Sequence, residues 1–324
     1  MIDLAIIIIN YKTPHLTGNV LQSLSGELDI TTMKVVIVDN NSRDDSLKIL
    51  EEWISYNHAD SWVKLIASDI NTGFSGGNNI GIQSVKAKNY LLLNSDTIVR
   101  PGAIHLLLET AENHHGAGLI SPRLEWEDGT PQESCFRFHT PVSELINSAS
   151  TGVVTKAFSK YVVAHPVKNE PDYYQWTSFA CVLIKSEVIE LIGLLDDEFF
   201  MYFEDVEFSY RAIEAGWKVL NNPAAHVVHL RGGSSPLKSQ AKLRKRLPRY
   251  FYESRTRYFY LLYGHVGLFL ANVLWSTGAI ITLARGLISS RYQPNIAEKQ
   301  WQDIWINFNN PKKAYTHPDF YEKT

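Results

Sequence analysis

The segment Leu93-Asn94-Ser95-Asp96 holds the first residues whose types and spacing point to chemistry. It closes the apolar run Tyr90–Leu93, which has the length of a strand, and Thr97 to Pro101 then lead into an apolar-periodic helix. A carboxylate at the carboxyl end of a buried strand lies where open α/β sheets bind ligands. Asp96 is therefore a candidate ligand for Mg²⁺ or Mn²⁺ held against a phosphate, because these ions prefer oxygen ligands and keep water and phosphate in their shell.

Polar residues also follow the other predicted strands of the first part of the chain, at Asn10, Asp39 and Ser68-Asp69. Because parallel strands end at one edge of a sheet, we expect these residues to converge with Asp96. The Asp39 carboxylate can accept hydrogen bonds from a ribose hydroxyl or a base N–H, although an Asx-turn explains it as well. Asp44, together with Ser42, is expected to cap the helix that follows.

A glycine-rich segment, Asn71-Thr72-Gly73-Phe74-Ser75-Gly76-Gly77-Asn78-Asn79-Ile80-Gly81, is predicted as a loop that feeds a helix. Such a loop lets backbone N–H groups approach a phosphate or a sugar. It is no Walker sequence, because no Gly-Lys-Ser/Thr follows, and it comes after the third strand, whereas the dinucleotide fingerprint follows the first. A tight turn that packs a helix on the sheet explains the glycines equally well.

Three acids, Glu204, Asp205 and Glu207, lie within the aromatic segment Phe199–Phe208. Aromatic surroundings exclude water and raise the pKa of a carboxyl group toward neutrality, as a general base requires. The same acids also suit the first turn of a helix, where the helix dipole favours negative charge. Both interpretations remain open from the residues alone.

The stretch Ala225-His226-Val227-Val228-His229 contains two histidines, the second of which ends it. On a strand, residues three apart face opposite sides, so one histidine at most reaches a given site. His229 can add an imidazole to a metal site near Asp96, and a structural histidine is the alternative.

The periodicity predicts the elements that position these residues. Runs such as Ile6–Ile9 and Val35–Val38 are apolar on both faces, which is typical of a parallel sheet covered by helices on both sides. The predicted strands are Leu4–Asn10, Lys34–Asp39, Val63–Ala67, Tyr90–Asn94, Ala117–Ser121, Ser178–Ile184, Trp217–Leu220 and Ala225–Val228. The predicted helices are Pro14–Leu24, Asp44–Tyr56, one that ends near Lys86, Ile104–Glu112, Glu187–Ile192 and Glu204–Ala215. Residues 122–176 are expected to form an irregular, mobile excursion.

Composition excludes some classes of protein. The chain has 324 residues, 45% hydrophobic and 20% charged, with a formal net charge of −3, so the whole protein is not expected to bind nucleic acid. Two cysteines form no disulfide framework and favour a reducing compartment. The apolar run Leu4–Ile9 is too short for a secretory core. We therefore expect a cytoplasmic α/β protein.

The last third of the chain is basic and then apolar. Lys238 to Arg257 holds eight lysines and arginines against the single acid Glu253, and Tyr258 to Ala284 contains no Asp, Glu, Lys or Arg. One helix over the apolar stretch would be roughly 40 Å long, but two helices broken near Gly264 are the predicted shape. A membrane-surface or hairpin anchor, a buried helix and a membrane span all remain open, and the basic run alone also suits a solvated helix face.

Taken together, the motifs resemble those of family 2 inverting glycosyltransferases with the GT-A fold, especially the bacterial rhamnosyltransferase-like branch. The resemblance runs in family order over about residues 4–235. The matching pieces are Ile8–Tyr11, Val38–Ser42, Asn71–Asn79, Leu93–Asp96, Phe200–Arg211, and Ala215-Gly216-Trp217 through His229 to Ser234.

The resemblance implies roles for individual residues and a nucleotide-sugar donor. Asn10, Tyr11 and Asp39 would hold the nucleotide, and the donor site would be lined by Asn71, Gly73, Phe74, Asn78, Asn94 and Ser95. Asp96, the acid of the Asp-X-Asp element, and His229 would bind the metal. Asp205, beside Glu204, would be the base that deprotonates the acceptor hydroxyl.

Two positions depart from the family pattern. Asn94 replaces the first acid of Asp-X-Asp and leaves one fewer charge on the metal. Phe179 stands where the family usually has glycine, on the expected acceptor side, so its bulk bears on acceptor identity.

These observations predict a GT-A α/β fold with a mostly parallel central sheet flanked by helices and a C-terminal helical extension. Residues 1–235 would form the glycosyltransferase domain, with a nucleotide-binding half (1–121) and an acceptor and catalytic half (122–235), and residues 236–324 the extension with its possible membrane contact. The predicted function is transfer of a sugar, such as rhamnose from dTDP-rhamnose, to a lipid-linked (polyprenyl) or saccharide acceptor in cell-surface polysaccharide synthesis, at the cytoplasmic face of the membrane. The alternatives are a UDP-hexose-dependent transferase and a non-catalytic nucleotide-binding GT-A scaffold, which Asn94 favours.

Overall fold

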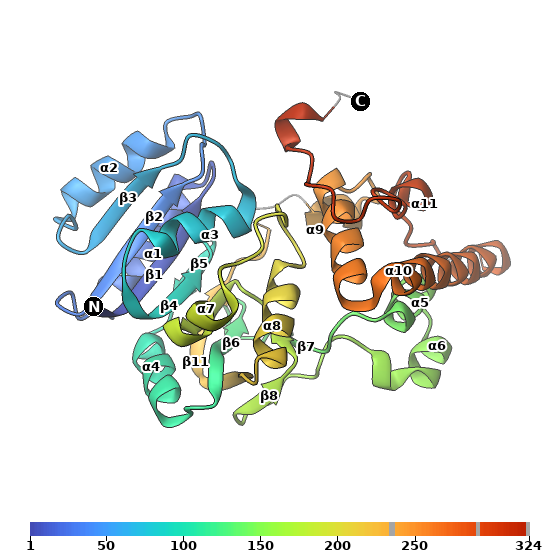
Figure 1. Ribbon diagram of the computed structural model, residues 1–324, viewed down its shortest axis with the longest axis horizontal. Helices are drawn as coiled ribbons and strands as arrows, with labels where there is room; N and C mark the ends of the chain where they lie inside the picture. Colours follow the sequence, from blue (N-terminus) through green and yellow to red (C-terminus); the bar gives the residue numbers. More distant parts are fainter. Residues whose placement is uncertain (233–236, 290–291, 322–324) are drawn as a thin grey trace. The chain divides into compact units, whose positions relative to one another are not determined.

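The computed structural model describes residues 1–232, 237–289 and 292–321, and it divides into two compact units (Figure 1). The first unit comprises Met1–Phe136, Pro166–Asp197 and Glu204–Ser234, and the second comprises Arg137–His165, Glu198–Phe203 and Ser235–Thr324. The expected domain boundary between residues 235 and 236, and the last residues of the motif that ends at Ser234, lie outside the described residues.

The first unit is built on one mixed sheet, with strand order β3-β2-β1-β4-β10-β6-β11-β5 and β8 paired to β11. In the described residues its strands are β1 (Ile2–Asn10), β2 (Met33–Asp39), β3 (Val63–Ala67), β4 (Ala87–Leu93), β5 (Thr97–Val99), β6 (Ala117–Glu125), β8 (Asp172–Tyr174), β10 (Cys181–Lys185) and β11 (Lys218–His229). Strands β3, β2, β1 and β4 are mutually parallel, so their carboxyl ends meet at one edge. Strand β10 runs antiparallel to both β4 and β6.

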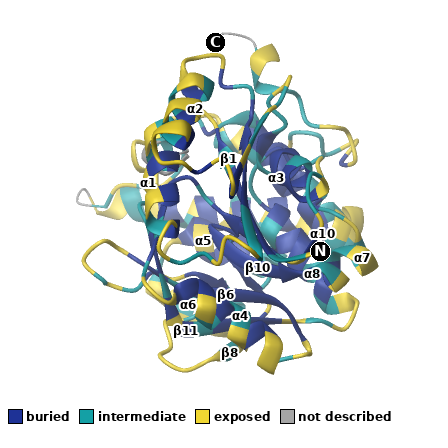
Figure 2. Ribbon diagram, turned by 90° about the vertical axis from the view of Figure 1, so that its left-hand side faces the viewer, coloured by how far each residue is buried: buried dark blue, intermediate teal, exposed yellow. Residues whose placement is uncertain are grey.

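Alternate residues of the strands enter two separate cores, one on each face of the sheet. On one face, Leu4, Ile6 and Ile8 pack with α1 (Pro14–Leu24), α2 (Ser46–Tyr56) and α4 (Ala103–Asn113). On the other, Ala5 and Ile7 pack with α3 (Gly73–Gln83), α7 (Ser186–Ile192) and α8 (Glu204–Glu214). The central strands are coloured as buried in Figure 2. The α/β fold with helices on both faces is thus confirmed.

Four local predictions were wrong. The glycine-rich segment is itself helical from Gly73, and its glycines Gly77 and Gly81 face the sheet. Trp217–Leu220 and Ala225–Val228 belong to one strand, β11, with a register shift between Asn222 and His226. The strand predicted over Ser178–Ile184 begins only at Cys181. Ser42 does not cap α2, since its hydroxyl donates to Asp39, while Asp44 Oδ1 accepts the N–H of Ser46.

The expected irregular excursion, residues 122–176, contains regular strands and helices, which corrects the prediction that it is irregular. Strand β6 continues to Glu125, and β7 (Cys135–Phe136) pairs with β9 (Trp176–Thr177). The helices α5 (Pro141–Ala149) and α6 (Gly152–Ala157) and the 3-10 turn Ser159–Tyr161 follow. Helix α5 begins at a capping box, in which Thr140 and Ser143 exchange side-chain and backbone hydrogen bonds.

The second unit is dominated by α10 (Arg249–Ile288), beside α9 (Leu237–Lys242), α11 (Gln300–Asp303) and the 3-10 turn Pro318–Phe320. Gly264, with φ 66° and ψ −172°, interrupts the helical dihedrals of α10, at the break predicted from the sequence. Among the described residues, α10 is the one helix that is long and apolar enough to cross a membrane, judged by length and composition alone.

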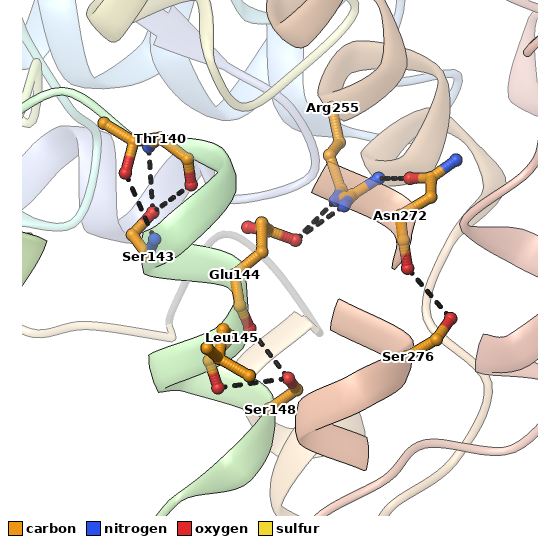
Figure 3. Close-up of polar contacts among 8 residues, drawn as sticks. All are labelled: Thr140, Ser143, Glu144, Leu145, Ser148, Arg255, Asn272 and Ser276. Atoms are coloured by element: carbon orange, nitrogen blue, oxygen red, sulfur yellow. Dashed lines mark hydrogen bonds and ion pairs between the residues drawn. The ribbon is translucent and has the colours of Figure 1, made fainter. Parts of the chain in front are cut away.

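A buried ionic cluster ties α5 to both segments of α10, as Figure 3 shows. Arg255 Nη2 lies 2.6 Å from Glu144 Oε2, and Arg255 Nη1 donates to Asn272 Oδ1 at 2.7 Å. Arg255 precedes the break at Gly264 and Asn272 follows it, so this cluster fixes the two segments of α10 against α5.

Candidate active site

The Asp39 carboxylate is held in place at the end of β2. Asn10 Nδ2 donates to Asp39 Oδ1 at 2.7 Å, and Ser42 donates its hydroxyl to Oδ1 at 2.6 Å and its N–H to Oδ2 at 3.1 Å. Asn10 is fully buried and its Oδ1 accepts from Thr17, so its amide is satisfied within the protein. Tyr11, the next residue, is exposed at 38%. The structure thus brings the three residues expected to hold the nucleotide to one edge of the sheet, with Asn10 beside Asp39.

The start of α3 is tied to the same edge through Asn40. Asn40 Nδ2 donates to Asn71 Oδ1 at 3.0 Å and to the carbonyl of Gly73 at 2.8 Å, while Asn40 Oδ1 accepts from the N–H of Thr72. The positive φ of Gly73, 70°, suits a residue without a side chain. Asparagine–backbone bonds therefore set where the first turn of α3 begins.

Two residues expected to line the donor site face inward on α3. The Phe74 side chain packs partly buried against the core, and Asn78 Nδ2 donates to the carbonyl of Phe74 at 2.9 Å. Glycines of the same helix permit close packing: an added Cβ on Gly81 would lie 2.4 Å from Ile7 Cγ2, and one on Gly77 3.2 Å from Ile9. At these two positions the glycines serve the contact between helix and sheet.

Asp96 and His229 are brought together by the antiparallel pairing of the short strand β5 with the end of β11. His229 pairs with Thr97 in the β5–β11 ladder, and the N–H of Leu230 donates to the carbonyl of Asp96 at 2.9 Å. As a result His229 Nε2 lies 3.5 Å from Asp96 Oδ1. The hydroxyl groups of Ser95 and Thr13 form a hydrogen bond with each other at 3.1 Å. His226 instead contacts Glu125 at 3.1 Å, in keeping with the opposite faces expected for the two histidines.

The donor set of Asp96 and His229 suits a divalent metal that a second molecule helps to bind. The Asp96 side chain is only 1% exposed and the imidazole 13%, so a cation between them would be largely shielded from water. In the described ranges, no group of three or more His, Cys, Asp or Glu side chains is arranged to hold a metal. One carboxylate and one imidazole leave most of the shell of Mg²⁺ or Mn²⁺ to water and phosphate oxygens, which is how proteins commonly bind these ions.

Glu204 and Asp205 form the first turn of α8, where burial opposes their ionisation. Burial raises the pKa of Asp205 from 3.8 to about 7, although hydrogen bonds from the backbone N–H groups of Val206, Asp205 and Phe179 act in the opposite direction. Burial, and then the charge of Asp205, raise the pKa of Glu204 well above its ordinary value. Asp205 is thus a carboxyl group poised to exchange a proton near neutral pH.

One short segment contacts both the candidate base and the candidate metal site. The N–H of Phe179 hydrogen bonds to Asp205, and the carbonyl of the next residue, Ala180, accepts the N–H of Asn94 at 2.9 Å. The Phe179 side chain is 2% exposed and packs against Phe208 in the core, at a ring distance of 5.9 Å. The ring fills the core and the backbone N–H contacts Asp205, so the effect of Phe179 on acceptor identity stays a prediction.

Three residues that support the site escaped our sequence analysis. Gln132 Nε2 donates to the carbonyl of His229 at 2.8 Å, and Gln132 Oε1 accepts from Arg231. Asn79 bonds the backbone of Leu195 in both directions. The third is Asn40, described above. Asn40 and Asn79 lie inside the motifs of the family, which was a usable signal, whereas Gln132 lies in the weakly periodic region and has none.

Comparison with known sequences agrees with this geometry. Residues 5–146 match the profile of Glycosyl transferase family 2. The low-salt glycan biosynthesis hexosyltransferase Agl10 of Haloferax volcanii is 31% identical over 214 residues, 65% of this chain and 61% of that protein. The N-acetylglucosaminyl-diphospho-decaprenol L-rhamnosyltransferase of Mycobacterium tuberculosis is 25% identical over 203 residues, 61% of this chain and 62% of that protein. The chain thus spans about three-fifths of the length of these curated relatives.

Solved structures show the same fold at lower sequence identity. The mannosyltransferase PcManGT from Pyrobaculum calidifontis, solved with GDP-Man and Mn²⁺, has a TM-score of 0.57 and 13% identity, over 95% of this chain and 85% of its own. The profile match, the relatives and the shared fold all agree with the sequence motifs that lie at the edge of the sheet. Residues 5–146 of the chain therefore match glycosyl transferase family 2, and the fold is of the GT-A type.

Proposed function

We propose that the protein transfers a sugar from a nucleotide-sugar donor to a hydroxyl group of an acceptor, with inversion at the anomeric carbon. The observation that carries this proposal is the Asp205 carboxyl group, whose pKa is raised to about 7. It accepts a hydrogen bond from the backbone of Phe179, and the next residue, Ala180, accepts the N–H of Asn94, two residues before Asp96. A base near neutrality and a cation site for a leaving diphosphate are the two parts that such a reaction needs.

On the donor side, the Asp39 carboxylate would accept hydrogen bonds from the ribose or the base of the nucleotide. Asn10 and Ser42 hold this carboxylate in place. Asp96 and His229 would hold the divalent metal. A bound Mg²⁺ or Mn²⁺ supplies positive charge that stabilises the departing diphosphate. Because these two side chains provide few ligands, metal and donor should bind together.

On the acceptor side, the Asp205 carboxylate accepts the proton of the acceptor hydroxyl. The acceptor oxygen forms a bond to the anomeric carbon from the face opposite the diphosphate, and the bond from that carbon to the diphosphate oxygen breaks. The products are the glycosylated acceptor, the nucleoside diphosphate and the protonated carboxyl of Asp205. Glu204, with its pKa also raised by burial, is the neighbour to test if Asp205 is not the base.

For the acceptor, we propose a saccharide on a polyprenyl-type lipid, within glycan or cell-surface polysaccharide synthesis at the cytoplasmic face of the membrane. The names of the relatives from Haloferax volcanii and Mycobacterium tuberculosis support this class. The second name also makes dTDP-rhamnose the first donor to test and UDP-hexoses the next.

The test is release of nucleoside diphosphate from a panel of nucleotide sugars with Mn²⁺, with and without a polyprenyl-diphosphate saccharide. We expect one donor to give acceptor-dependent release, and Asp205→Asn to lower the rate by about 10²–10⁴-fold with donor affinity unchanged. Donor binding without release by the unmodified chain would identify a non-catalytic scaffold. Retained turnover in Asp205→Asn would remove Asp205 from the role of base.

A further inference from the structure

The segment of α10 after Gly264 exposes a row of apolar side chains, in which the hydroxyl residue Thr277 is also exposed. These side chains, which we call the apolar stripe, are Val266, Leu270, Val273, Ile280, Leu283 and Leu287. Their spacing of three, four or seven residues places them in one row along the helix. Val266 is 73% exposed, Ile280 60% and Leu287 91%. A contiguous apolar surface of this kind marks an interaction site.

The opposite face of the same helix is buried and includes polar and small residues beside Leu268 and Trp275. Asn272 and Thr282 are fully buried, and an added Cβ on Gly278 would lie 2.6 Å from the carbonyl oxygen of Leu145 in α5. A helix in a water-soluble surface normally has the reverse arrangement, with polar residues outward. The outward face of α10 is therefore suited to an apolar environment.

Tryptophan and lysine side chains lie along the segment that packs beside α10. Trp305 lies 6.3 Å from Phe269, and Trp301 lies 5.3 Å from Trp275, measured between ring centroids. Both Trp301 and Trp305 remain 38% exposed. Such half-exposed indole rings are typical of the boundary between lipid and water.

In the second unit, several acidic side chains are buried, whereas many lysines are exposed. Its buried acids Glu144, Glu253 and Asp303 are each paired with an arginine, at 2.6 Å, 2.8 Å and 2.8 Å. The acids of this unit that are exposed in the described residues are Glu298 and Asp319. Exposed lysines are more numerous and include Lys156, Lys160, Lys242, Lys299, Lys312 and Lys313. The outer surface of this unit is thus positive, complementary to anionic lipid headgroups.

We propose that the apolar stripe of α10, together with Trp301 and Trp305 of the segment that packs against this helix, lies flat on an anionic bilayer. This inference rests on the proposed function, since it supplies the surface on which a lipid-linked acceptor would reach the protein. Burial of aliphatic side chains between acyl chains, and attraction of the exposed lysines to anionic headgroups, provide the binding free energy.

The structure favours lying on the membrane over spanning it. The inner face of α10 is fastened to α5 by the ion pair of Glu144 and Arg255, and Arg285 donates to the carbonyl of Ser150 at 2.7 Å. A span would take these charged groups, with α5, into hydrocarbon, which is strongly unfavourable. The excess of exposed lysines on the second unit also opposes the pairing of two copies through the stripe.

The test is co-sedimentation of the full chain with vesicles of equal parts phosphatidylglycerol and phosphatidylcholine, and with phosphatidylcholine alone. We expect binding to the anionic vesicles, weakened by added salt, and release by an alkaline wash. Val266→Ser/Ile280→Ser/Leu287→Ser should lower the partition coefficient by at least about 100-fold, because each buried aliphatic side chain contributes substantially. The matched control is Ile30→Ser/Tyr56→Ser/Leu191→Ser, three exposed apolar residues of the first unit, which should leave binding unchanged.

Several outcomes would overturn the inference. These are no binding by the unmodified chain, equal binding by the stripe variant, resistance to the alkaline wash, or an oligomer in light scattering that the stripe variant dissociates. Thermal unfolding of the stripe variant confirms that it folds. Mn²⁺-dependent nucleotide binding, measured without vesicles, separates the two proposals. If the unmodified chain shows no such binding, the proposed function is contradicted, but the proposed membrane contact of the apolar stripe is not.

Discussion

Adjacent carboxyl groups at Glu204, which is buried, and Asp205, which is partly buried, lie in one helical turn where two negative charges are costly. Burial is the main cause of the raised pKa of each group, and the charge of Asp205 adds to the effect on Glu204. At neutral pH the pair therefore retains protons that it would lose in water. The backbone N–H groups that face Asp205 keep it the easier of the two to ionise.

Catalysis should follow the ionisation of Asp205. Because only the carboxylate can accept a proton, we expect kcat/KM to rise with pH through about 7 and to level above it. The measurement is the initial rate at limiting donor and acceptor between pH 5 and 9. The residual rate of Asp205→Asn should not follow this curve, and a wild-type profile already level at pH 5 would contradict the assignment.

The same group should lower stability as pH rises. Its pKa is higher in the folded protein than in the unfolded chain, so the folded state binds more protons between about pH 4 and pH 7, and stability falls across that window. Asp205→Asn removes this penalty. We expect the Tm of the variant to exceed that of the wild type at pH 8 by about 2–4 °C, and by less at pH 5. An equal difference at both pH values would show that ionisation is not its cause.

Metal affinity should depend on Asp96 and on nucleotide together. Asp96→Ala removes the buried carboxylate, and we expect it to abolish the part of nucleoside diphosphate affinity that Mn²⁺ contributes in calorimetry. Asp69→Ala is the matched control, since Asp69 follows β3 of the same sheet but is exposed, and it should bind as the wild type does. If chelator and Mn²⁺ give the wild type the same affinity, Asp96 is not a metal ligand.

At the level of elements, the sequence was most informative where periodicity was strong. The runs Ile6–Ile9 and Val35–Val38 predicted buried parallel strands, and their order places Asn10 and Asp39 at one edge, as observed. The start of α3 was not predicted, because glycine has low helix propensity. The reason for the glycines is their close contact with the sheet, which the sequence alone does not show. The β5–β11 pairing, which joins Asp96 to His229, depends on contacts distant in sequence that no local pattern encodes.

The close contact of α3 with the sheet can be tested at Gly81. In Gly81→Ala the new Cβ would lie 2.4 Å from Ile7 Cγ2, so we expect a loss of about 1–3 kcal/mol in the free energy of unfolding despite the better helix propensity of alanine. Denaturant unfolding measures it. Gly26→Ala, where nothing lies within 4 Å of the added Cβ, should be neutral, and equal stability of both variants would contradict the packing argument.

For the whole molecule, the two units are interleaved along the chain. The second unit takes Arg137–His165 from the middle of the sequence, so its helix α5 packs against α10, which lies near the end. The C-terminal segment is consequently no removable appendage in structural terms. Leu145, Ile146 and Glu144 of α5 are all buried.

A chain truncated after residue 232 should therefore be unstable. Glu144 would lose Arg255, and loss of one partner of a buried ion pair costs about 3–5 kcal/mol, in addition to the apolar surface exposed on α5. We expect increased binding of a hydrophobic dye and loss of soluble protein compared with the full chain. A truncated protein that unfolds cooperatively at the wild-type temperature would show that α5 needs no such partner.

The pairing of β5 with β11 also has a consequence for the order of events during synthesis. Strands β1 to β4 can form their parallel pairs while the ribosome is still far from residue 218, but the imidazole of His229 reaches Asp96 only after β11 has been made and has docked against β5. Contacts of such long sequence separation form late in folding. The nascent chain therefore acquires its nucleotide edge first and its cation site last, so a partly folded molecule lacks the complete pair of Asp96 and His229.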